Sequence, residues 1–295
     1  MRKFNRVIVA DGWLLSHVVG NVEEEVRRLS EGNVEFYSDY PASEHELIKR
    51  IGNADCVLIG PLKTTINKAV LDACQNIKYI GISGTSIKNI DIGEVERRNI
   101  ALRNVAAYAD EATAEYVFAQ LLMLARNLGV QEWKEPWELY GKKIGIVGLG
   151  YIGRQVALRA LGFGMNVLYY QRTRDLKWEK KGIGYRQLNE LLAESDIITL
   201  HVPENTRILG KEEFRRIRRN VVLINTSTGV NFDLDAFLEW IKDGKNFAII
   251  GPYSKSYSEF KAIPNIVIGR QSKTVESEKR LSRIFIDNLK SYLKG

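Results

Sequence analysis

Short β-branched runs alternate with helix-length stretches along the whole chain, and this alternation constrains the fold more than any other feature. The runs include "RVIVA", "NVEFY", "ADCVLIG" and "IKYIGIS" in the first half, and "KIGIV", "NVLYY", "DIITL", "NVVLINT" and "NIVIG" in the second. Such alternation is typical of parallel sheets with helices on both faces. At 295 residues, 45% of them hydrophobic, the chain is long enough for two domains. The sequence therefore predicts an α/β fold with two doubly wound parallel sheets.

Two longer helices are expected from the apolar pattern. Residues 109–128, "ADEATAEYVFAQLLMLARNL", are apolar on more than one stripe, so this helix should be buried nearly all round. Residues 275–293 place Leu281, Ile284, Phe285 and Leu289 on one face. We expect this final helix to pack back across the first domain.

A glycine-rich turn, "GLGYIG", directly follows the apolar strand "KIGIV" and opens a helix. This order of strand, turn and helix is the context that a dinucleotide-binding turn requires. Gly148 permits the tight turn, Gly150 lets a pyrophosphate approach the backbone, and Gly153 lets the helix pack on the strand. Tyr151 and Ile152 complete the turn, and the helix start offers N–H groups to phosphates. The alternative is a purely structural turn.

The end of the next strand reads "VLYYQRTRD", and it bears on the choice of nucleotide. A site for NAD(H) usually presents a carboxylate here to the ribose hydroxyls. Gln171 stands in that place, and Arg172, Thr173 and Arg174 offer two guanidinium groups and a hydroxyl to an additional phosphate. NADP(H) is therefore favoured, with NAD(H) as the other cofactor to consider. In the alternative interpretation both arginines are solvated and Asp175 serves as a displaced acid.

The net charge excludes few classes of binding partner, whereas the cysteine content indicates a reducing compartment. The formal net charge of +7 favours anionic partners without specifying them. The most basic run, 211–220, has Phe214 and Ile217 at helical spacing, and it lacks the aromatic interleaving of nucleic-acid platforms. Cys56 and Cys74 have no metal-type spacing, so free thiols in a reducing compartment, and no metal site, are expected. With no leader and no apolar run of about 18 residues, a cytoplasmic protein without membrane contact is predicted.

Several motifs in a fixed order resemble the D-isomer-specific 2-hydroxyacid dehydrogenase family, which includes glyoxylate/hydroxypyruvate reductases. They are "NID" (89–91), "ADEATAE" (109–115), "LYGKKIGIVGLGYIGRQVA" (139–157), "LHVPENTR" (200–207), "VVLINTSTG" (221–229) and "IPNIVI" (263–268). The resemblance implies a flavodoxin-like substrate domain, residues 1–98 plus 271–295, and an inserted Rossmann cofactor domain, residues 99–270. It also implies further cofactor contacts from His201, Val202, Pro203 and Thr226.

The family uses an arginine to clamp the substrate carboxylate and a histidine, paired with a glutamate, to move the proton. At the corresponding positions this chain has Thr228, Ser256 and Gln271, which are not expected to be functional equivalents. The three histidines are His17, His45 and His201, and none follows residue 201. The resemblance makes His201 a wall of the nicotinamide pocket rather than a proton carrier. Tyr253 and Lys255 are candidates for a replacement proton relay.

Two functions remain open on the sequence alone. The first is an NAD(P)-dependent oxidoreductase that prefers NADP(H) and acts on an unidentified 2-hydroxy or 2-keto acid through an altered catalytic site. The second is an inactive NADP(H)-binding regulatory or sensor protein. A homodimer is expected in either case, although the segment 129–138, which helps form the family's dimer arm, is short. A nucleic-acid scaffold built on the basic helix is the least favoured interpretation.

Overall fold

The structure is a computed structural model that describes residues 2–128, 135–203, 206–227, 229–242, 244–251, 260, 262–269 and 272–295. The chain forms two compact units. The first comprises Met1–Ala109 and Thr274–Gly295, and the second comprises Asp110–Lys273. The expected boundary at residue 98 falls ahead of a strand, residues 101–104, that pairs within the first unit. Each unit has its own sheet and is described separately.

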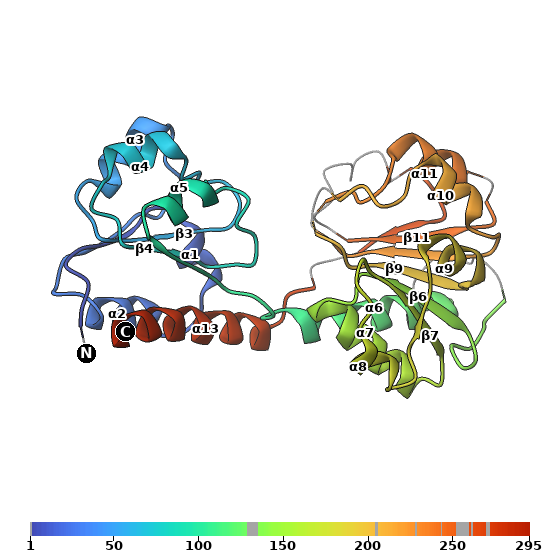
Figure 1. Ribbon diagram of the computed structural model, residues 1–295. Coiled ribbons are helices and arrows are strands. Elements are labelled where there is room, and N and C mark those ends of the chain that lie inside the picture. The colour runs from blue at the N-terminus through green and yellow to red at the C-terminus, as the bar shows by residue number, and fades with distance from the viewer. Residues whose placement is uncertain are drawn as a thin grey trace. The chain divides into compact units, whose positions relative to one another are not determined.

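The first unit is a five-stranded sheet in the order β2-β1-β3-β4-β5, and all its strand pairs are parallel. Its strands are β1 (Val7–Val9), β2 (Val34–Phe36), β3 (Cys56–Ile59), β4 (Tyr79–Ile82) and β5 (Ala101–Asn104). Its helices are α1 (Trp13–His17), α2 (Val22–Arg28), α3 (Glu44–Ile51), α4 (Lys68–Ala73), α5 (Ile92–Arg97) and α13 (Val275–Lys294). In Figure 1, α3, α4 and α5 cover one face, and α2 and α13 cover the other.

Each face of this sheet has its own apolar core. Leu47, Val70 and Val95 bring α3, α4 and α5 onto one side of the buried strands. On the other side α13 contributes Leu281, Phe285 and Leu289, which lie at the helical spacing that the sequence predicted. The final helix therefore does pack back onto the first unit, as expected.

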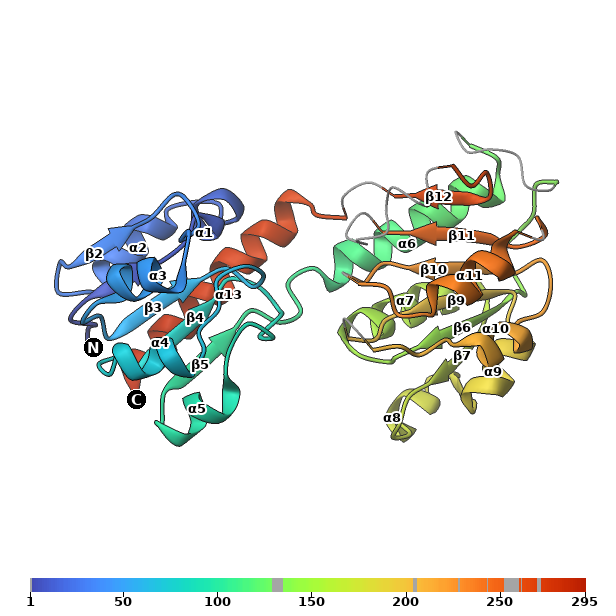
Figure 2. The same ribbon diagram turned by 90° about the horizontal axis from the view of Figure 1, so that it is seen from above.

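The second unit is a seven-stranded sheet in the order β12-β11-β10-β9-β6-β7-β8, again parallel throughout. Figure 2 shows this sheet from above, with β12 and β11 at one edge and β7 toward the other. Its strands are β6 (Lys143–Val147), β7 (Asn166–Tyr170), β8 (Gly184–Tyr185), β9 (Ile197–Leu200), β10 (Val222–Asn225), β11 (Phe247–Ile250) and β12 (Ile266–Ile268). Its helices are α6 (Asp110–Ala125), α7 (Tyr151–Gly162), α8 (Leu176–Glu179), α9 (Leu188–Glu194), α10 (Lys211–Arg216) and α11 (Leu234–Ile241).

Helices cover both faces of this sheet too, so the predicted α/β class with two doubly wound parallel sheets is confirmed. The core on one face is built from α6 and α7, and the core on the other from α9, α10 and α11. The basic run forms α10, where Phe214 is buried and Ile217 follows it into the core. No helix in the described part of the chain combines the length and the apolar character that a membrane crossing requires.

Candidate functional site

The strand order of the second sheet identifies where a ligand should bind. From β6 the chain moves outward to β7 and β8, then returns to place β9 on the other side of β6. Open parallel sheets bind ligands at such a switch point, beyond the carboxyl ends of the strands. The glycine turn, residues 148–153, follows β6 at this edge, and His201 follows β9.

The glycines of the turn are required for different reasons. Gly148 has a φ of +98°, and a Cβ added there would lie 2.5 Å from the main-chain oxygen of His201. A Cβ at Gly153 would lie 2.1 Å from the Gly148 oxygen, so the start of α7 packs directly on the turn. At Gly150 a Cβ would meet no atom within 4 Å, so this position is open. Gly150 is also the N-cap of α7 and provides no side-chain cap, which leaves helix N–H groups for an anion.

The two residues between Gly150 and Gly153 lie in different surroundings. Tyr151 is exposed at the first position of α7, whereas Ile152 packs against the core beneath the turn. Arg154, one residue after the last glycine, donates from Nη2 to Asp175 Oδ2 over 2.9 Å. The helix that carries the turn is thereby tied to the segment that follows β7.

The two arginines in the segment after β7 differ in their ion pairs. Arg174 donates from Nε and Nη2 to Glu179 over 3.0 and 2.6 Å, and its guanidinium lies 5.1 Å from the centre of the Tyr185 ring. This ion pair raises the pKa of Arg174. Arg172 is exposed, and no described residue forms an ion pair with it. Gln171 donates from Nε2 to the Thr173 oxygen over 2.6 Å, which closes a small turn around Arg172.

Asp175 is already engaged in structure. Besides its pairing with Arg154, its side chain is the N-cap of α8 and accepts from the Trp178 N–H. Its own N–H donates to the hydroxyl of Tyr169 over 2.8 Å. The geometry therefore gives no support to Asp175 as a displaced acid for the ribose hydroxyls.

His201 is held in a neutral state at the carboxyl end of β9. Burial lowers its pKa to about 3. Its Nε2 lies 2.9 Å from the hydroxyl oxygen of Thr199, and its main-chain N–H donates to Val147 over 2.8 Å. An imidazole with this pKa carries no proton to donate near neutral pH. Val202 and Pro203 continue from it above the glycine turn, where a Cβ on Gly148 would also approach Val202 Cγ1 to 3.3 Å.

The segment after β10 is closed by an asparagine. Asn225 Nδ2 donates to the Gly229 oxygen over 3.1 Å, and its Oδ1 accepts from the Ser227 N–H over 3.0 Å. Thr226 lies inside this closed segment, and its buried hydroxyl oxygen has no hydrogen-bond partner among the described residues. Gly251 packs on it, since a Cβ there would lie 3.1 Å from the Thr226 Cα.

The five residues predicted for catalysis lie outside the described residues. They are Thr228, Tyr253, Lys255, Ser256 and Gln271. The structure therefore brings together the residues predicted for the cofactor at one sheet edge and leaves the catalytic predictions as predictions. Among the described residues, no group of three or more histidine, cysteine, aspartate or glutamate side chains is arranged to hold a metal ion.

Sequence reasoning overlooked buried polar residues at the carboxyl edges of both sheets. In the first unit, Asp11 accepts from the Gly60 N–H over 3.0 Å and from the Trp13 N–H over 3.1 Å, and it also pairs with the Thr64 hydroxyl. Its position directly after the apolar run "RVIVA" was the available signal. In the second unit, Asn231 joins the segments after β9 and β10, and nothing in "GVNF" signals that role.

The residues present fit a nicotinamide dinucleotide. Gly148 and Gly150 form a cradle that a Cβ would fill or block, and α7 offers uncapped N–H groups beside it. Arg172 can take an anionic group next to the ribose position, and the buried Thr226 hydroxyl is a hydrogen-bonding group still without a partner among the described residues. The donor set therefore suits phosphates at one end and a polar ring substituent at the other.

Comparisons with known proteins agree with this site. Residues 104–251 match the family model described as D-isomer specific 2-hydroxyacid dehydrogenase, NAD binding domain. The chain is 32% identical over 285 residues to glyoxylate reductase of Korarchaeum cryptofilum, covering 86% of this chain and 84% of that protein. It is 30% identical over 279 residues to hydroxypyruvate reductase of Blautia hydrogenotrophica, covering 85% of each.

A solved structure is similar over nearly the whole chain. It is an acyclic imino acid reductase in complex with NADPH and D-Arg, with a TM-score of 0.84 and 25% sequence identity. The similarity covers 98% of this chain and 97% of that one. The fold, the order of the motifs and the glycine turn at the sheet edge therefore all agree with a dinucleotide-binding protein of this kind.

Proposed function

The chain belongs to the D-isomer specific 2-hydroxyacid dehydrogenase family, and on that premise we propose that it is an NADP(H)-preferring oxidoreductase with an altered catalytic site. Its substrate would be a 2-keto acid or a close relative. The observation that carries the proposal is the intact cradle at Gly148 and Gly150, set at the switch point of the second sheet. A bound nicotinamide supplies or accepts the hydride. The chain's own residues bind and orient the two reactants.

The preference for NADP(H) is supported by the contrast between the two arginines. The position usual for a ribose-binding carboxylate is occupied by Gln171, which cannot repel a 2′-phosphate. Arg172 is exposed without an ion-pair partner among the described residues, whereas Arg174 is held by Glu179. We therefore assign the 2′-phosphate contact to Arg172 and give Arg174 the role of fixing the segment against α8.

The altered catalytic site is supported by the sequence and by His201. Thr228 cannot form a bidentate ion pair with a carboxylate, and Gln271 cannot deliver a proton near neutral pH. His201 is the single histidine of the second unit, and its pKa of about 3 removes it as a proton donor as well. Reduction of a carbonyl would then need a proton from elsewhere, for which Tyr253 and Lys255 stay the candidates.

A second candidate substrate is a 2-imino acid in its protonated, iminium form. A carbonyl oxygen must receive a proton when hydride reaches carbon, because the alkoxide is a strong base. An iminium nitrogen already carries that proton, so hydride transfer yields the amine directly and NADP⁺ is the other product. The observation that favours it is that His201, the histidine at the cofactor edge, is uncharged near neutral pH because burial lowers its pKa to about 3. The similar reductase solved with NADPH and D-Arg acts on acyclic imino acids, as its description says.

One experiment separates these functions. The purified protein is titrated with NADPH and with NADH by isothermal titration calorimetry, and NADPH consumption is then followed with a panel of 2-keto acids, each with and without ammonium. Turnover with the keto acid alone supports carbonyl reduction. Turnover that requires ammonium, with an amino acid as product, supports imine reduction. Binding without turnover is the result expected of the regulatory or sensor alternative, and failure to bind either nucleotide would contradict the proposal as a whole.

We propose that the second copy in a homodimer covers the exposed side of α6 and α7. Leu158 on α7 and Phe163, the C-cap residue of α7, are 40% and 38% exposed, and the Phe163 ring stacks on Phe118 of α6 with centroids 5.0 Å apart. Exposed apolar side chains close together on one helix and its end are what a subunit interface would cover. Light scattering coupled to size-exclusion chromatography tests this, and a monomer at all concentrations would contradict it.

We also propose a cytoplasmic location, on the evidence of the cysteines. Cys56 and Cys74 are both free and buried. Burial raises the pKa of each thiol, which keeps both in the unreactive form. Free thiols of this kind are typical of a reducing compartment. Fractionation of cells that express the tagged protein is the direct test.

A further inference from the structure

Asn231 is a fully buried side chain between β10 and α11 that holds the segment following β9. Its Nδ2 donates to the main-chain oxygen of Pro203 over 3.0 Å and to that of Thr206 over 3.2 Å. Its own main-chain oxygen accepts from the Ile208 N–H over 2.8 Å. One asparagine thus fixes three points of a neighbouring segment that has no regular secondary structure at Pro203 and Thr206.

The fixed segment lies directly against the glycine turn. Its first residue, His201, donates to Val147 at the end of β6, and a Cβ on Gly148 would lie 2.5 Å from the His201 oxygen. Val202 accepts from the Ser227 hydroxyl over 3.4 Å, which adds a contact from the segment after β10. The segment is therefore held against the glycine turn at His201 and Val202, and by Asn231 at Pro203. A substitution of Asn231 should therefore alter the conformation of residues beside the glycine turn, where the cofactor is expected to bind.

The chemistry of Asn231 argues against a purely structural role. Its Oδ1 is buried and has no hydrogen-bond partner in the described part of the chain. A buried acceptor left unpaired costs about 1–3 kcal/mol, and an apolar side chain of similar volume would avoid that cost. Because both donated hydrogen bonds of Asn231 go to one segment, we expect this side chain to act through that segment.

We propose that Asn231 is a positioning residue for the nicotinamide half of the cofactor. The adenosine half is expected on the β7 side of the glycine turn, where Gln171 and Arg172 lie, whereas Asn231 acts on the β9 and β10 side. By holding Pro203, it keeps Val202 and Pro203 in place beside the glycine turn, where we expect the nicotinamide to lie. This inference rests on the proposed cofactor binding and adds to it a residue that touches no part of the cofactor.

The test separates the two halves of the cofactor. Asn231→Leu removes both donated hydrogen bonds and keeps the branching and the number of side-chain heavy atoms. Dissociation constants for NADPH and for 2′,5′-ADP, which lacks nicotinamide, are measured by calorimetry. We expect the NADPH constant to rise about tenfold or more, because two hydrogen bonds of about 1 kcal/mol each no longer order the segment. The 2′,5′-ADP constant should not change. If the leucine variant does not fold, Asn231→Ser, which is smaller and keeps one donor, should give the same pattern with a smaller change.

The matched control is Asn246→Leu. Asn246 is also a buried asparagine of the second sheet, but it lies at the opposite edge, where its side chain contacts the Val221 N–H and the Trp240 oxygen. Its replacement should lower the melting temperature without changing either dissociation constant. Equal weakening of NADPH and 2′,5′-ADP by Asn231→Leu, or no weakening of NADPH in a folded variant, would overturn the inference. If the unaltered protein binds neither ligand, the proposed function itself has failed.

Discussion

At the scale of single residues, the two arginines after β7 give a direct test of nucleotide choice. Arg172→Ala should weaken NADPH binding about tenfold to a hundredfold, since hydrogen bonds to a charged group contribute about 1.5–3 kcal/mol. NADH, which has no 2′-phosphate, should bind as before. Arg174→Ala should leave both affinities unchanged, because this guanidinium is already bound by Glu179. Calorimetric titration of the two variants decides it, and the reverse pattern would transfer the phosphate contact to Arg174.

His201 should leave a signature in the pH dependence of stability. The unfolded chain takes up a proton at this residue below about pH 6.5, whereas the folded chain does so only near its pKa of about 3. The unfolded state therefore binds more protons between these values, and the free energy of unfolding falls as pH is lowered through that window. The contribution is up to about 1.4 kcal/mol per pH unit.

The measurement is urea unfolding of the wild type and of His201→Gln at several pH values within that window. Glutamine does not titrate, so the variant should lose stability less steeply on acidification than the wild type. Carboxyl groups titrate in both proteins and cancel in the comparison. Parallel pH profiles would mean that His201 is accessible to protons in the folded protein.

The roles of some of these residues could be predicted from the sequence and those of others could not, for physical reasons. Glycines at fixed spacing after a strand are tied to one backbone geometry, so Gly148 and Gly153 were assigned the roles that the structure supports. Arg174 is predicted as a phosphate ligand together with Arg172, and the sequence does not reveal that its guanidinium pairs with Glu179. Asn231 was overlooked because its partners are main-chain oxygens far along the chain, at Pro203 and Thr206.

At the scale of elements, two glycine-to-alanine substitutions in the glycine turn should have different effects, one on stability and the other on NADPH binding. Gly148→Ala combines a φ of +98° with a 2.5 Å approach to the His201 oxygen, so it should destabilise the second unit by about 2 kcal/mol or more. Gly150→Ala meets no atom within 4 Å and should leave the melting temperature unchanged. Because its methyl group occupies the open position expected for the pyrophosphate, it should nonetheless weaken NADPH binding. Calorimetry of both variants tests the pair, and full NADPH affinity in Gly150→Ala would contradict the placement of the phosphates.

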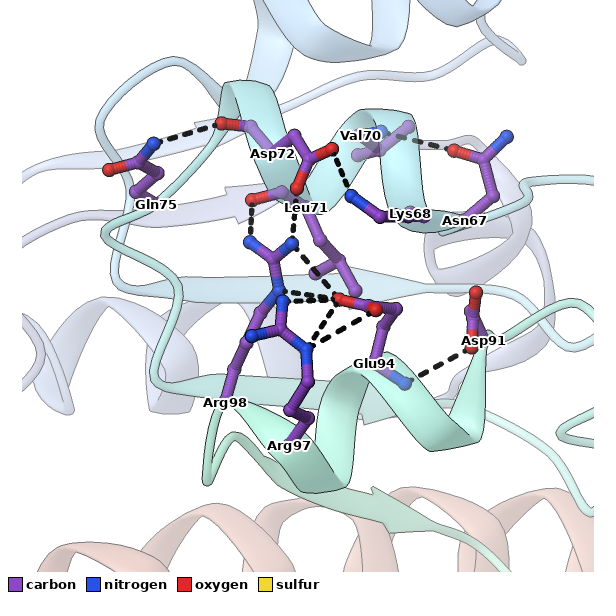
Figure 3. Close-up of polar contacts among 10 residues, drawn as sticks. All are labelled: Asn67, Lys68, Val70, Leu71, Asp72, Gln75, Asp91, Glu94, Arg97 and Arg98. Carbon is purple, nitrogen blue, oxygen red and sulfur yellow. Dashed lines mark hydrogen bonds and ion pairs between the residues drawn. The ribbon is translucent and has the colours of Figure 1, made fainter.

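In the first unit, an arginine joins two short helices, as Figure 3 shows. Arg98, at the end of α5, donates to the Leu71 oxygen over 2.6 Å and pairs with Asp72 on α4, and it also pairs with Glu94 on its own helix. Among the described residues, Arg97 forms an ion pair only with Glu94, and its side chain is far more exposed than that of Arg98. Arg97 and Arg98 are therefore the same type of residue, but only Arg98 links α5 to α4.

That difference predicts which arginine matters for stability. Arg98→Ala should lower the denaturation midpoint of the first unit, because the Leu71 oxygen and Asp72 lose the partner that links α4 to α5. Arg97→Ala should leave the midpoint within experimental error, since exposed pairs within one helix contribute little. Chemical denaturation of both variants compares them. An equal loss in the two would show that the link between the helices is not the stabilising part of the cluster.

The elements themselves were largely predictable, while their limits were not. Runs such as "KIGIV" and "NVLYY" are β-branched or aromatic and became β6 and β7. β5, "ALRN", has no such composition and owes its conformation to pairing with β4, so a sequence pattern does not reveal it. For this reason the expected domain boundary at residue 98 lies ahead of β5, whereas the units meet after Ala109.

At the scale of the whole molecule, each unit has cores of its own, and the first is assembled from both ends of the chain. The α13 residues Leu281, Phe285 and Leu289 pack with Val7, from the beginning of the chain, in one apolar core. The cofactor cradle belongs to the second unit alone, since Gly148 and Gly150 lie within Asp110–Lys273. Damage to one unit should therefore be separable from function in the other.

Phe285→Ala tests this separation. Phe285 is 2% exposed, and removing its ring should destabilise the first unit by about 3–5 kcal/mol through lost burial and the cavity that remains. In a calorimetric scan we expect the transition of the first unit to move to lower temperature, while added NADPH still raises the transition of the second unit, because a ligand stabilises the unit that binds it. The NADPH dissociation constant below both transitions should equal that of the wild type. A single transition that shifts as a whole, or a loss of NADPH affinity in step with the loss of stability, would mean that the two units fold as one and that the cradle depends on α13.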